Sequence, residues 1–430
     1  MRVLFKPIDV LIYYEHVVRE LDSCMILKYR LEQMGLKAMV VPIHRNRYLT
    51  IIKYRPKIVV MPFLFADEND IVFKEFCKCY GSVLCLNLHH EQLYNEMTKG
   101  HFMPKNEVSR DAYHLSWGVN FAKDLMQCGV EYKKILIDGN PRTDNYFSIS
   151  SDSISAKLKG YKEVIFIPTS FSWAFVDESY FIEKAKIDPK KFVKQKKITI
   201  ATVDLFLLAI RKLAFKFPDK VFVLRPHPFE DVACYEKCLK LLIDRPIEGN
   251  IKILREGNIY DWLKVSDLVI GWLTTVSVEA SLFGKKNVIF LPIDLDESMQ
   301  TIFIKLYDTI ISDYDDLERI VGNIELYNPK NLKLHEYVDS SMGKADGLVN
   351  ARIAQDICDI IRRNHQVQKI TVRVLVLMGK AISIDLVKNI FIRLNLLVKL
   401  NVMYAGLMED LLSYSALNKY YEDLKLRIQK

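Results

Sequence analysis

Short apolar runs alternate with longer helix-forming segments along most of this chain. A helical pattern over residues 17–35 ends at Gly35, where a left-handed cap is expected. The apolar runs of the first 140 residues lie at 2–5, 10–14, 38–43, 58–63, 82–88 and 135–139. Strands that alternate with helices in this way predict βαβ units and a parallel sheet.

The alternation starts again in the second half of the chain. Its apolar runs lie at 163–169, 220–226, 251–254, 267–272 and 287–292, with helical patterns between most of them. The polar, turn-rich stretch 145–160 separates the two sets. We therefore expect an α/β protein with two Rossmann-like parallel-sheet domains that face a cleft. The expected segments are 1–150, 160–345 and a helical extension over 346–430.

Composition excludes several classes of protein. The 430 residues are 50% hydrophobic and 27% charged, as in ordinary globular chains, and the net charge of +8 is too small to indicate nucleic-acid binding by itself. No uncharged apolar run reaches the roughly 20 residues that span a bilayer, and the N-terminal run reads as a strand and not as a signal peptide. The eight cysteines lack paired zinc-ligand spacing, which predicts reduced cytoplasmic thiols and no metal site.

The last part of the chain has a different pattern. Between Lys369 and Val402, apolar residues predominate, with six basic residues and one acidic residue. Such a basic amphipathic segment fits an anionic surface at the inner face of the cytoplasmic membrane. A helix packed on the protein core with its lysines in solvent fits equally well, and the sequence leaves both interpretations open.

The sequence Arg225-Pro226-His227-Pro228 follows a predicted buried strand. Its two prolines keep the loop extended, so that stiff backbone holds the histidine. A cation beside a hydrogen-bond donor at the carboxyl end of a strand is suited to a phosphate. The alternative is a loop histidine that bonds to a backbone carbonyl.

A second motif lies about forty residues later, over 266–285. A predicted strand ends at Gly271, hydroxyl residues gather in the turn, and a helix begins. Free N–H groups at the start of a helix favour an anion, Thr275 and Ser277 add hydroxyl donors, and Glu279 can accept from ribose hydroxyls. The alternatives are a plain N-cap for Thr275 and a dipole-complementing carboxylate for Glu279.

Together these two motifs resemble the C-terminal domain of bacterial surface-carbohydrate glycosyltransferases of the GT-B type. That group includes capsular and lipopolysaccharide Kdo transferases and, more distantly, teichoic-acid glycerophosphotransferases. The resemblance covers about residues 8–362. Further segments that resemble the group are Glu15–Asp22, His89–Gln92, Trp117-Gly118, Gly139–Asp144 and Gly343–Gly347.

The resemblance implies a nucleotide-activated donor that binds to the second half of the chain, and an acceptor domain in the first half. His227 is then expected at the donor phosphate with Thr275 and Ser277, in the loop that also carries Arg225, and Glu279 at the nucleoside. Donors in groups with this His-Pro loop are often cytidine nucleotides, either CMP-sugars such as Kdo or CDP-alditols. No cofactor is implied.

Inverting sugar transfer needs a base for the acceptor hydroxyl and stabilisation of the leaving phosphate. Relatives often carry an acidic pair where this chain has His89-His90-Glu91-Gln92. Arg142, after the last strand of the first half, is expected to pair with phosphate or an acidic acceptor, or with a partner in the interdomain linker. The candidate bases are Glu91, which is favoured, His90, Glu20 and Asp22.

Three functions are compatible with these features. The first is a metal-independent glycosyltransferase that moves a sugar from a nucleotide donor to a bacterial surface polysaccharide or lipid-linked glycan. The second is the transfer of an alditol phosphate from a CDP-alditol, as in teichoic-acid synthesis. The third is a non-catalytic assembly subunit that binds a nucleotide or a partner, although the donor motif with His227, Thr275, Ser277 and Glu279 favours an enzyme.

Overall fold

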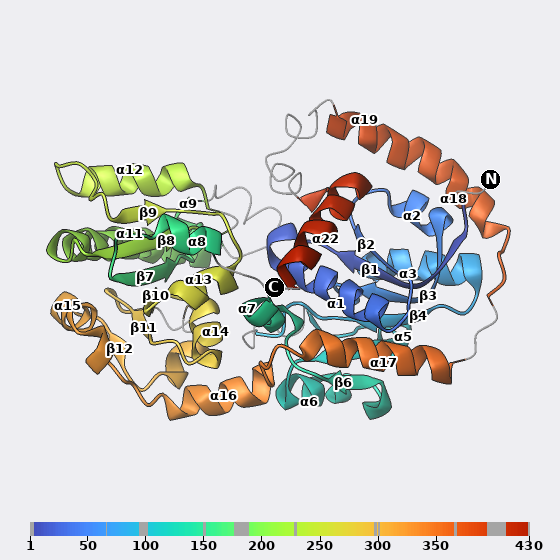
Figure 1. Cartoon of the computed structure of the whole chain (residues 1–430), viewed down its shortest axis with the longest axis horizontal. Helices are drawn as coiled ribbons and strands as arrows, with labels where there is room; N and C mark the ends of the chain where they lie inside the picture. Colours follow the sequence, from blue (N-terminus) through green and yellow to red (C-terminus); the bar gives the residue numbers. More distant parts are fainter. Residues whose placement is uncertain are drawn as a thin grey trace. The chain divides into compact units, whose positions relative to one another are not determined.

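The computed structural model shows two compact units (Figure 1). Residues 1–149 and 340–430 form the first unit, and residues 150–339 form the second. The residues predicted as a helical extension therefore share a unit with the N-terminal segment. The structure describes residues 4–65, 67–93, 102–148, 152–175, 189–227, 230–295, 299, 302–364, 368–393 and 410–428.

The first unit is built on a parallel sheet of six strands in the order β2-β1-β3-β4-β5-β6. The strands are β1 (Lys6–Tyr14), β2 (Ala38–Pro42), β3 (Tyr54–Met61), β4 (Leu84–Asn87), β5 (Tyr113–Ser116) and β6 (Ile135–Ile137). In β1, Val10 pairs with Ala38 of β2 on one side and with Ile58 of β3 on the other. The inner strands are buried on both faces, as parallel sheets covered by helices require.

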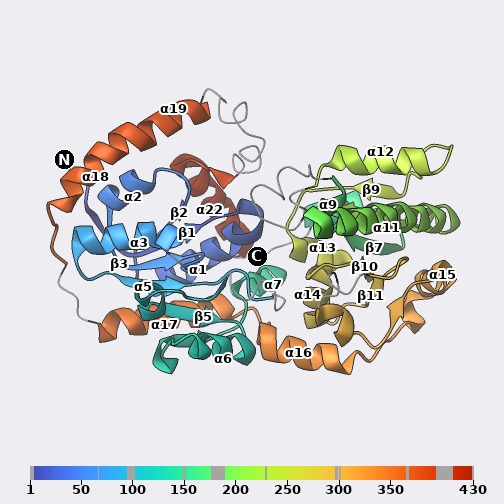
Figure 2. The same ribbon diagram turned by 180° about the vertical axis from the view of Figure 1, so that it is seen from behind.

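Helices cover both faces of this sheet (Figures 1 and 2). One face carries α2 (Arg47–Lys53), α3 (Asp67–Tyr80) and α18 (Arg373–Lys380). The other carries α1 (Asp22–Gln33), α17 (Val349–Arg363) and α22 (Tyr414–Ile428). The unit also contains α5 (Glu107–Asp111), α6 (Val119–Gln127), α7 (Asp144–Ser148), α19 (Val387–Arg393) and the π-helical turns η1 (Val17–Leu21) and η7 (Ala381–Leu386).

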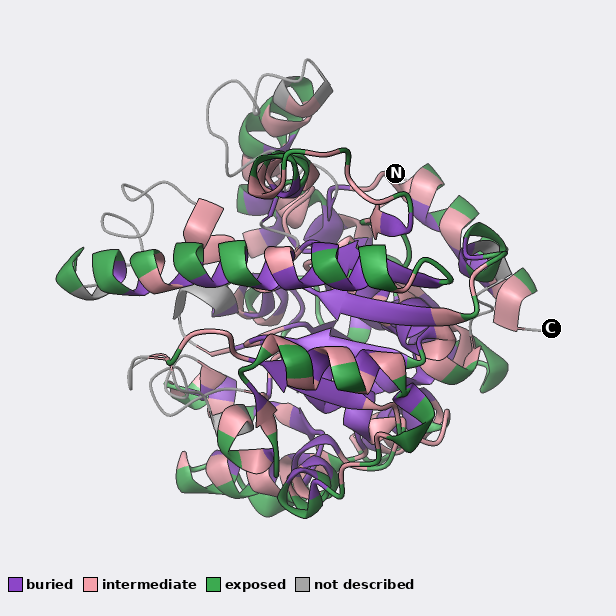
Figure 3. Cartoon of the chain, turned by 90° about the vertical axis from the view of Figure 1, so that its left-hand side faces the viewer, coloured by how far each residue is buried: buried purple, intermediate pink, exposed green. Residues whose placement is uncertain are grey.

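The second unit has a parallel sheet of six strands in the order β12-β11-β10-β7-β8-β9. The strands are β7 (Glu163–Pro168), β8 (Lys220–Arg225), β9 (Ile251–Ile253), β10 (Leu268–Gly271), β11 (Asn287–Phe290) and β12 (Ile310–Ile311). Its helices are α8 (Asp152–Lys157), α9 (Ser172–Phe175), α11 (Pro189–Lys216), α12 (Val232–Leu242), α13 (Ile259–Val265), α14 (Val276–Leu282), α15 (Tyr314–Gly322) and α16 (Leu332–Met342), which contains the boundary with the first unit. Figure 3 shows buried strands between helices whose outer sides are exposed.

Two parallel six-stranded sheets confirm the predicted α/β fold class, and the differences are local. The helix expected over 17–35 begins as the π-helical turn η1 and ends before Gly35, which has the expected positive φ of 81°. The short strands β5 and β12 were not predicted. The first strand begins at Lys6 and continues through Asp9, which interrupts its apolar pattern. Asp9 is accommodated there because it accepts from the Lys37 backbone N–H and pairs with Lys57.

Three glycine-containing segments that resemble the glycosyltransferases lie against one another in the first unit, namely those that begin at Trp117, Gly139 and Gly343. A Cβ on Gly118 would lie 2.2 Å from the Ser340 carbonyl oxygen, and a Cβ on Gly343 would lie 2.2 Å from the Trp117 carbonyl oxygen and 3.0 Å from the Cα of Gly139. Backbone therefore passes backbone at a distance that only glycine permits. The segment 340–343 is seated in this way against the loops that follow β5 and β6.

Candidate functional site

A cluster of charged side chains lies where β1 ends. Glu20, in the π-helical turn η1, is fully buried, and its carboxylate accepts from Arg19 Nη2 at 2.7 Å and from the Glu15 N–H at 2.7 Å. Burial would raise the pKa of Glu20, but His90, which is protonated below about pH 4, together with Arg19 and these hydrogen bonds outweighs burial and lowers that pKa to about 2. Glu20 is therefore a fixed negative charge that orients Arg19.

Arg19 joins this turn to the loop after β4. Its Nη1 donates to Glu91 Oε1, while its Nη2 also lies 3.7 Å from Glu15 Oε2. Unlike Glu20, the Glu91 side chain keeps 38% of its surface exposed. One guanidinium thus holds a buried carboxylate on one side and an accessible carboxylate on the other, and only Glu91 of this pair can meet a substrate.

The loop after β4 turns through a strained residue. His89 has a φ of +47°, and its backbone is held by the Asn87 and Gln92 side chains, which bond to its N–H and its carbonyl oxygen. The turn separates the two histidine rings. His89 Nε2 lies 2.7 Å from His114 Nδ1, whereas His90 Nε2 lies 4.0 Å from Glu20 Oε2, on the side of Glu91 and Arg19.

His90 is buried and neutral at pH 7. Burial lowers the pKa of His90 to about 4 and outweighs the opposite effect of Glu20, and the nearby Arg142 and Arg19 lower this pKa further. Within the described part of the chain, neither of its ring nitrogens has a hydrogen-bond partner. The neutral imidazole thus has one donor and one acceptor that no described residue satisfies, although its side chain is only 2% exposed.

Arg142 follows β6 at the same edge of the sheet. Asn140 Oδ1 accepts from the Arg142 N–H at 3.1 Å, and the guanidinium lies 5.2 Å from the centre of the Trp117 ring, in a cation–π arrangement. The Trp117 backbone is fixed in turn, because its main-chain N–H donates to Gln92 Oε1 at 2.8 Å. The predicted residues Glu91, His90 and Arg142 thus come from two loops that follow β4 and β6.

Sequence reasoning missed residues at this edge of the sheet that are distant in the sequence. Asp410 accepts from the Val17 N–H at 2.6 Å and lies 3.0 Å from His16 Nδ1, and His44 Nε2 lies 3.2 Å from Glu15 Oε1. These contacts fix the start of the π-helical turn η1 and the residues just before it. The remaining candidate base, Asp22, accepts from the Tyr420 hydroxyl of α22. No spacing pattern connects residues 16 and 410, so only the fold reveals them.

In the second unit, the structure gives different surroundings to Arg225 and His227. The Arg225 guanidinium is buried and donates to the carbonyl oxygens of Arg255, Glu256 and Gly257 at 2.7–2.8 Å. Burial lowers the pKa of Arg225 to about 10, so that it remains charged at neutral pH. These bonds hold the loop between β9 and α13. Pro228, the last residue of the motif, lies outside the described residues.

His227 is held by a buried carboxylate that sequence reasoning missed. Glu230 accepts from the His227 N–H at 3.0 Å, from the Tyr235 hydroxyl at 2.7 Å and from the Thr169 and Ser172 hydroxyls. Ser172 Oγ also lies 3.4 Å from His227 Nδ1. The spacing His-Pro-x-Glu in the sequence was the available signal, because a carboxylate three residues on can bond back to the histidine N–H.

The second motif predicted to bind a donor follows β10, which neighbours β7 in the sheet. Ser277 is buried beside Gly271, where an added Cβ would lie 2.1 Å from Ser277 Oγ. Val276 N–H donates to Thr274 Oγ1 at 3.3 Å, while among the described residues the Thr275 hydroxyl makes no capping hydrogen bond to α14. Glu279 is buried in the first turn of this helix. Since β7, β8 and β10 are neighbours, both donor motifs leave the carboxyl edge of one sheet.

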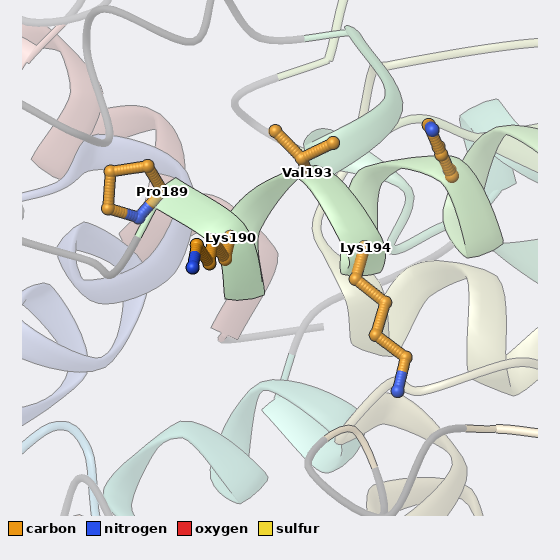
Figure 4. A pocket seen from close by; sticks show the side chains of 5 residues that line it. Pro189, Lys190, Val193 and Lys194 are labelled. Atoms are coloured by element: carbon orange, nitrogen blue, oxygen red, sulfur yellow. The ribbon is translucent and has the colours of Figure 1, made fainter.

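A hollow elsewhere in the second unit carries none of this chemistry (Figure 4). It lies along the first turns of α11 and is lined by Pro189, Lys190, Val193, Lys194 and Lys197. All five residues come from one helix, and they include no acid, histidine or hydroxyl group. In the described residues, no cluster of three or more histidine, cysteine or acidic side chains is arranged to hold a metal ion.

The buried histidines predict that the protein loses stability in mild acid. Burial lowers the pKa values of His90 and His114 to about 4, whereas an unfolded histidine titrates near 6.5. The unfolded chain therefore binds more protons between these values, and each histidine is expected to cost about 2 kcal/mol of stability at pH 5 relative to pH 8. The paired Glu20, with its lowered pKa of about 2, adds a loss below about pH 4.5.

Urea unfolding measured from pH 8 to pH 5 tests this expectation. The variant His90→Gln should remove about 2 kcal/mol of the pH dependence. The exposed His335 gives the control, and His335→Gln should leave the pH profile unchanged. An unchanged profile in His90→Gln would show that His90 is not buried in its neutral form.

Comparison with known proteins supports the fold. No family model and no curated protein matches this sequence. Similar solved structures include a putative UDP-N-acetylglucosamine 2-epimerase from Listeria monocytogenes, with 14% identity and a TM-score of 0.54 over 85% of this chain and 100% of that one. The wall teichoic acid polymerase TagF has 13% identity and a TM-score of 0.54 over 84% of this chain and 91% of its own. The S. aureus protein MnaA, in a co-structure with UDP, has 13% identity and a TM-score of 0.51 over 84% and 98%. Such low identities show a GT-B-like fold and nothing finer.

Proposed function

We propose that this chain is a glycosyltransferase that moves a sugar from a nucleotide-activated donor to a bacterial surface glycan, either a polysaccharide or a lipid-linked intermediate. The observation that carries the proposal is the accessible carboxylate of Glu91, held by Arg19 next to the neutral imidazole of His90. The GT-B-like fold supports it, because the residues proposed to bind the donor phosphate follow neighbouring strands at the carboxyl edge of the second sheet.

Each group has a role in the proposed reaction. Glu91 takes the proton of the acceptor hydroxyl, whose oxygen attacks the anomeric carbon as the bond to the donor phosphate breaks. His90 orients that hydroxyl and is the alternative base. Arg142 pairs with phosphate or with an acidic acceptor. Glu20 and Asp22 hold their neighbours, as their buried or occupied carboxylates indicate.

The second unit binds the donor in this proposal. His227, Thr275 and Ser277 contact the phosphate that leaves with the nucleotide, and Glu279 contacts the nucleoside. Glu230 is a positioning residue, because it fixes the His227 backbone and the Ser172 hydroxyl. The Arg225 guanidinium donates its hydrogen bonds to carbonyl oxygens of the protein and not to the donor. In this proposal it fixes the 255–257 loop and attracts the phosphate at long range.

Transfer of an alditol phosphate from a CDP-alditol is the second candidate. The structural likeness to a wall teichoic acid polymerase favours it. The two reactions differ in the bond that breaks. Sugar transfer breaks the bond between the sugar and the donor phosphate, so it releases a nucleoside diphosphate, or CMP from a CMP-sugar. Alditol phosphate transfer breaks the bond between the two phosphates of the CDP-alditol, so it always releases CMP. A protein that binds a nucleotide and catalyses neither step would be the non-catalytic assembly subunit.

A panel of CMP, CDP, UDP and GDP, with free sugars as a reference, tests the proposal by thermal stabilisation. A ligand at 100 times its Kd stabilises the folded state by about 2.7 kcal/mol. We expect a cytidine nucleotide to do so in the wild-type protein and in His335→Ala, an exposed control in the same unit, but not in His227→Ala. Stabilisation by UDP or GDP alone would discard the cytidine donor, and no stabilisation by any nucleotide would contradict the enzyme.

A further inference from the structure

The helical segment that runs through α18, η7 and α19 has an apolar face in solvent. Nine large apolar side chains between residues 370 and 390 are exposed, among them Val372 at 82%, Leu375 at 68% and Ile382 at 67%. A spacing of three or four residues places most of them on one side of the helix. The full set is Ile370, Val372, Leu375, Val376, Ile382, Ile384, Leu386, Val387 and Ile390. Gly379 lies in the middle of this segment, and no atom lies within 4 Å of a Cβ built on it.

The opposite side of the segment is fixed to the protein. Val374 and Leu377 belong to the core formed with α2 and α3, as the packing of α18 in Figure 2 also shows. The buried Asp385 accepts from the Leu49 N–H at 2.8 Å, and Lys388 Nζ donates to the His44 carbonyl oxygen at 2.6 Å. The helix therefore cannot turn its apolar face inward without losing these bonds, and the exposed face is its stable orientation.

Charge along the segment is almost entirely positive. The exposed Lys369 and the half-buried Arg373, Lys380 and Lys388 fall within the same stretch, and the only acidic residue there is the buried Asp385. Arg373 is paired with Glu75 of α3 at 2.6 Å. Because the Lys388 ammonium bonds to the His44 carbonyl oxygen on the fixed side, Lys369 and Lys380 supply the positive charge nearest the apolar face in this part of the chain. Basic groups that flank an apolar stripe complement an anionic lipid surface, in which the apolar side chains enter the acyl region and the cations meet the headgroups.

We propose that the apolar face of residues 370–390 docks on an anionic phospholipid bilayer, with the helix lying parallel to the surface. Among the described residues, no helix is long and apolar enough to cross a membrane, so the contact is interfacial. The part of the predicted segment at 394–402 lies outside the described residues and is not needed for this face. The proposal does not depend on the transferred group, because it rests on exposure and charge alone.

Flotation of the full chain with vesicles tests the proposal. Vesicles of phosphatidylglycerol and phosphatidylcholine should bind the wild-type protein more strongly than vesicles of phosphatidylcholine alone, and added salt should weaken the difference. The triple variant Leu375→Ser, Ile382→Ser and Leu386→Ser should lose about 100-fold in partitioning, because three apolar side chains no longer enter the bilayer. These positions are exposed, so the fold should keep its thermal midpoint.

A matched triple variant controls for surface hydrophobicity. Leu241, Leu326 and Leu332 are exposed at 77%, 82% and 69% in the second unit, and their replacement by serine should change vesicle binding by less than twofold. Equal binding by both triple variants would overturn the proposal. So would a wild-type dimer in solution that the first triple variant converts to a monomer, because a second copy of the chain would then cover this face.

Discussion

Replacement of Glu91 by glutamine is expected to lower kcat for glycosyl transfer by about 100- to 10,000-fold, the usual contribution of a positioned base. Glutamine has nearly the same shape, and its amide oxygen can still accept from Arg19 Nη1, which now bonds to Glu91 Oε1. What the variant lacks is a group that can take the acceptor proton. KM for the donor should change little, because the donor motifs lie in the other unit.

Steady-state rates with saturating donor and acceptor measure this effect. Glu131→Gln is the control, because Glu131 is an exposed carboxylate in the same unit with a surface partner, Lys133. His90→Gln should cost less than Glu91→Gln, because the His90 side chain is buried whereas the Glu91 side chain keeps 38% of its surface exposed. A wild-type rate in Glu91→Gln together with a large loss in His90→Gln would assign the base to His90.

The positions of the strands could be predicted to the extent that each strand carries its own apolar signal. β8 is a buried run rich in valine, leucine and phenylalanine, and β4 carries two leucines and a cysteine; the sequence places both strands to within two residues. β5 carries His114 and Ser116 inside a strand of only four residues, so its pattern is too short and too polar to detect. The polar His114 is tolerated there because it meets His89, a residue 25 positions away.

The candidate site was predictable only in part, for a similar reason. Glu91, His90 and Arg142 were found because each follows a recognisable strand. Arg19 lies in the segment Glu15–Asp22 that resembles the glycosyltransferases, but its role depends on a bond to Glu91 across 72 residues. Asp410 reaches Val17 across 393 residues, and no local pattern encodes that contact. The sequence also left the C-terminal segment undecided between an anionic membrane surface and a helix packed on the protein core. In residues 373–390, the structure packs one face of the segment on the core and leaves the other face in solvent.

Replacement of Gly343 by alanine is expected to destabilise the first unit by about 3 to 5 kcal/mol. The residue has a φ of +68°, which costs an L-amino acid about 1 kcal/mol. The larger part comes from contact, because the new Cβ would lie 2.2 Å from the Trp117 carbonyl oxygen and 3.0 Å from the Gly139 Cα. Both are backbone atoms, so no rotamer change relieves the overlap.

The variant Gly35→Ala, in the same unit, separates the cost of a positive φ from the cost of steric overlap. Gly35 has a φ of +81° and no atom within 4 Å of a built Cβ, so Gly35→Ala should cost only the conformational part, about 1 kcal/mol. Hydrogen exchange of peptides from β1 and β3 reports the stability of this unit separately from the other. Because Trp117 lies beneath the Arg142 guanidinium, Gly343→Ala should also impair transfer in protein that remains folded. Equal losses in the two variants would mean that segment 340–343 is not held against Trp117 by backbone contact, and the placement of Arg142 would then need another cause.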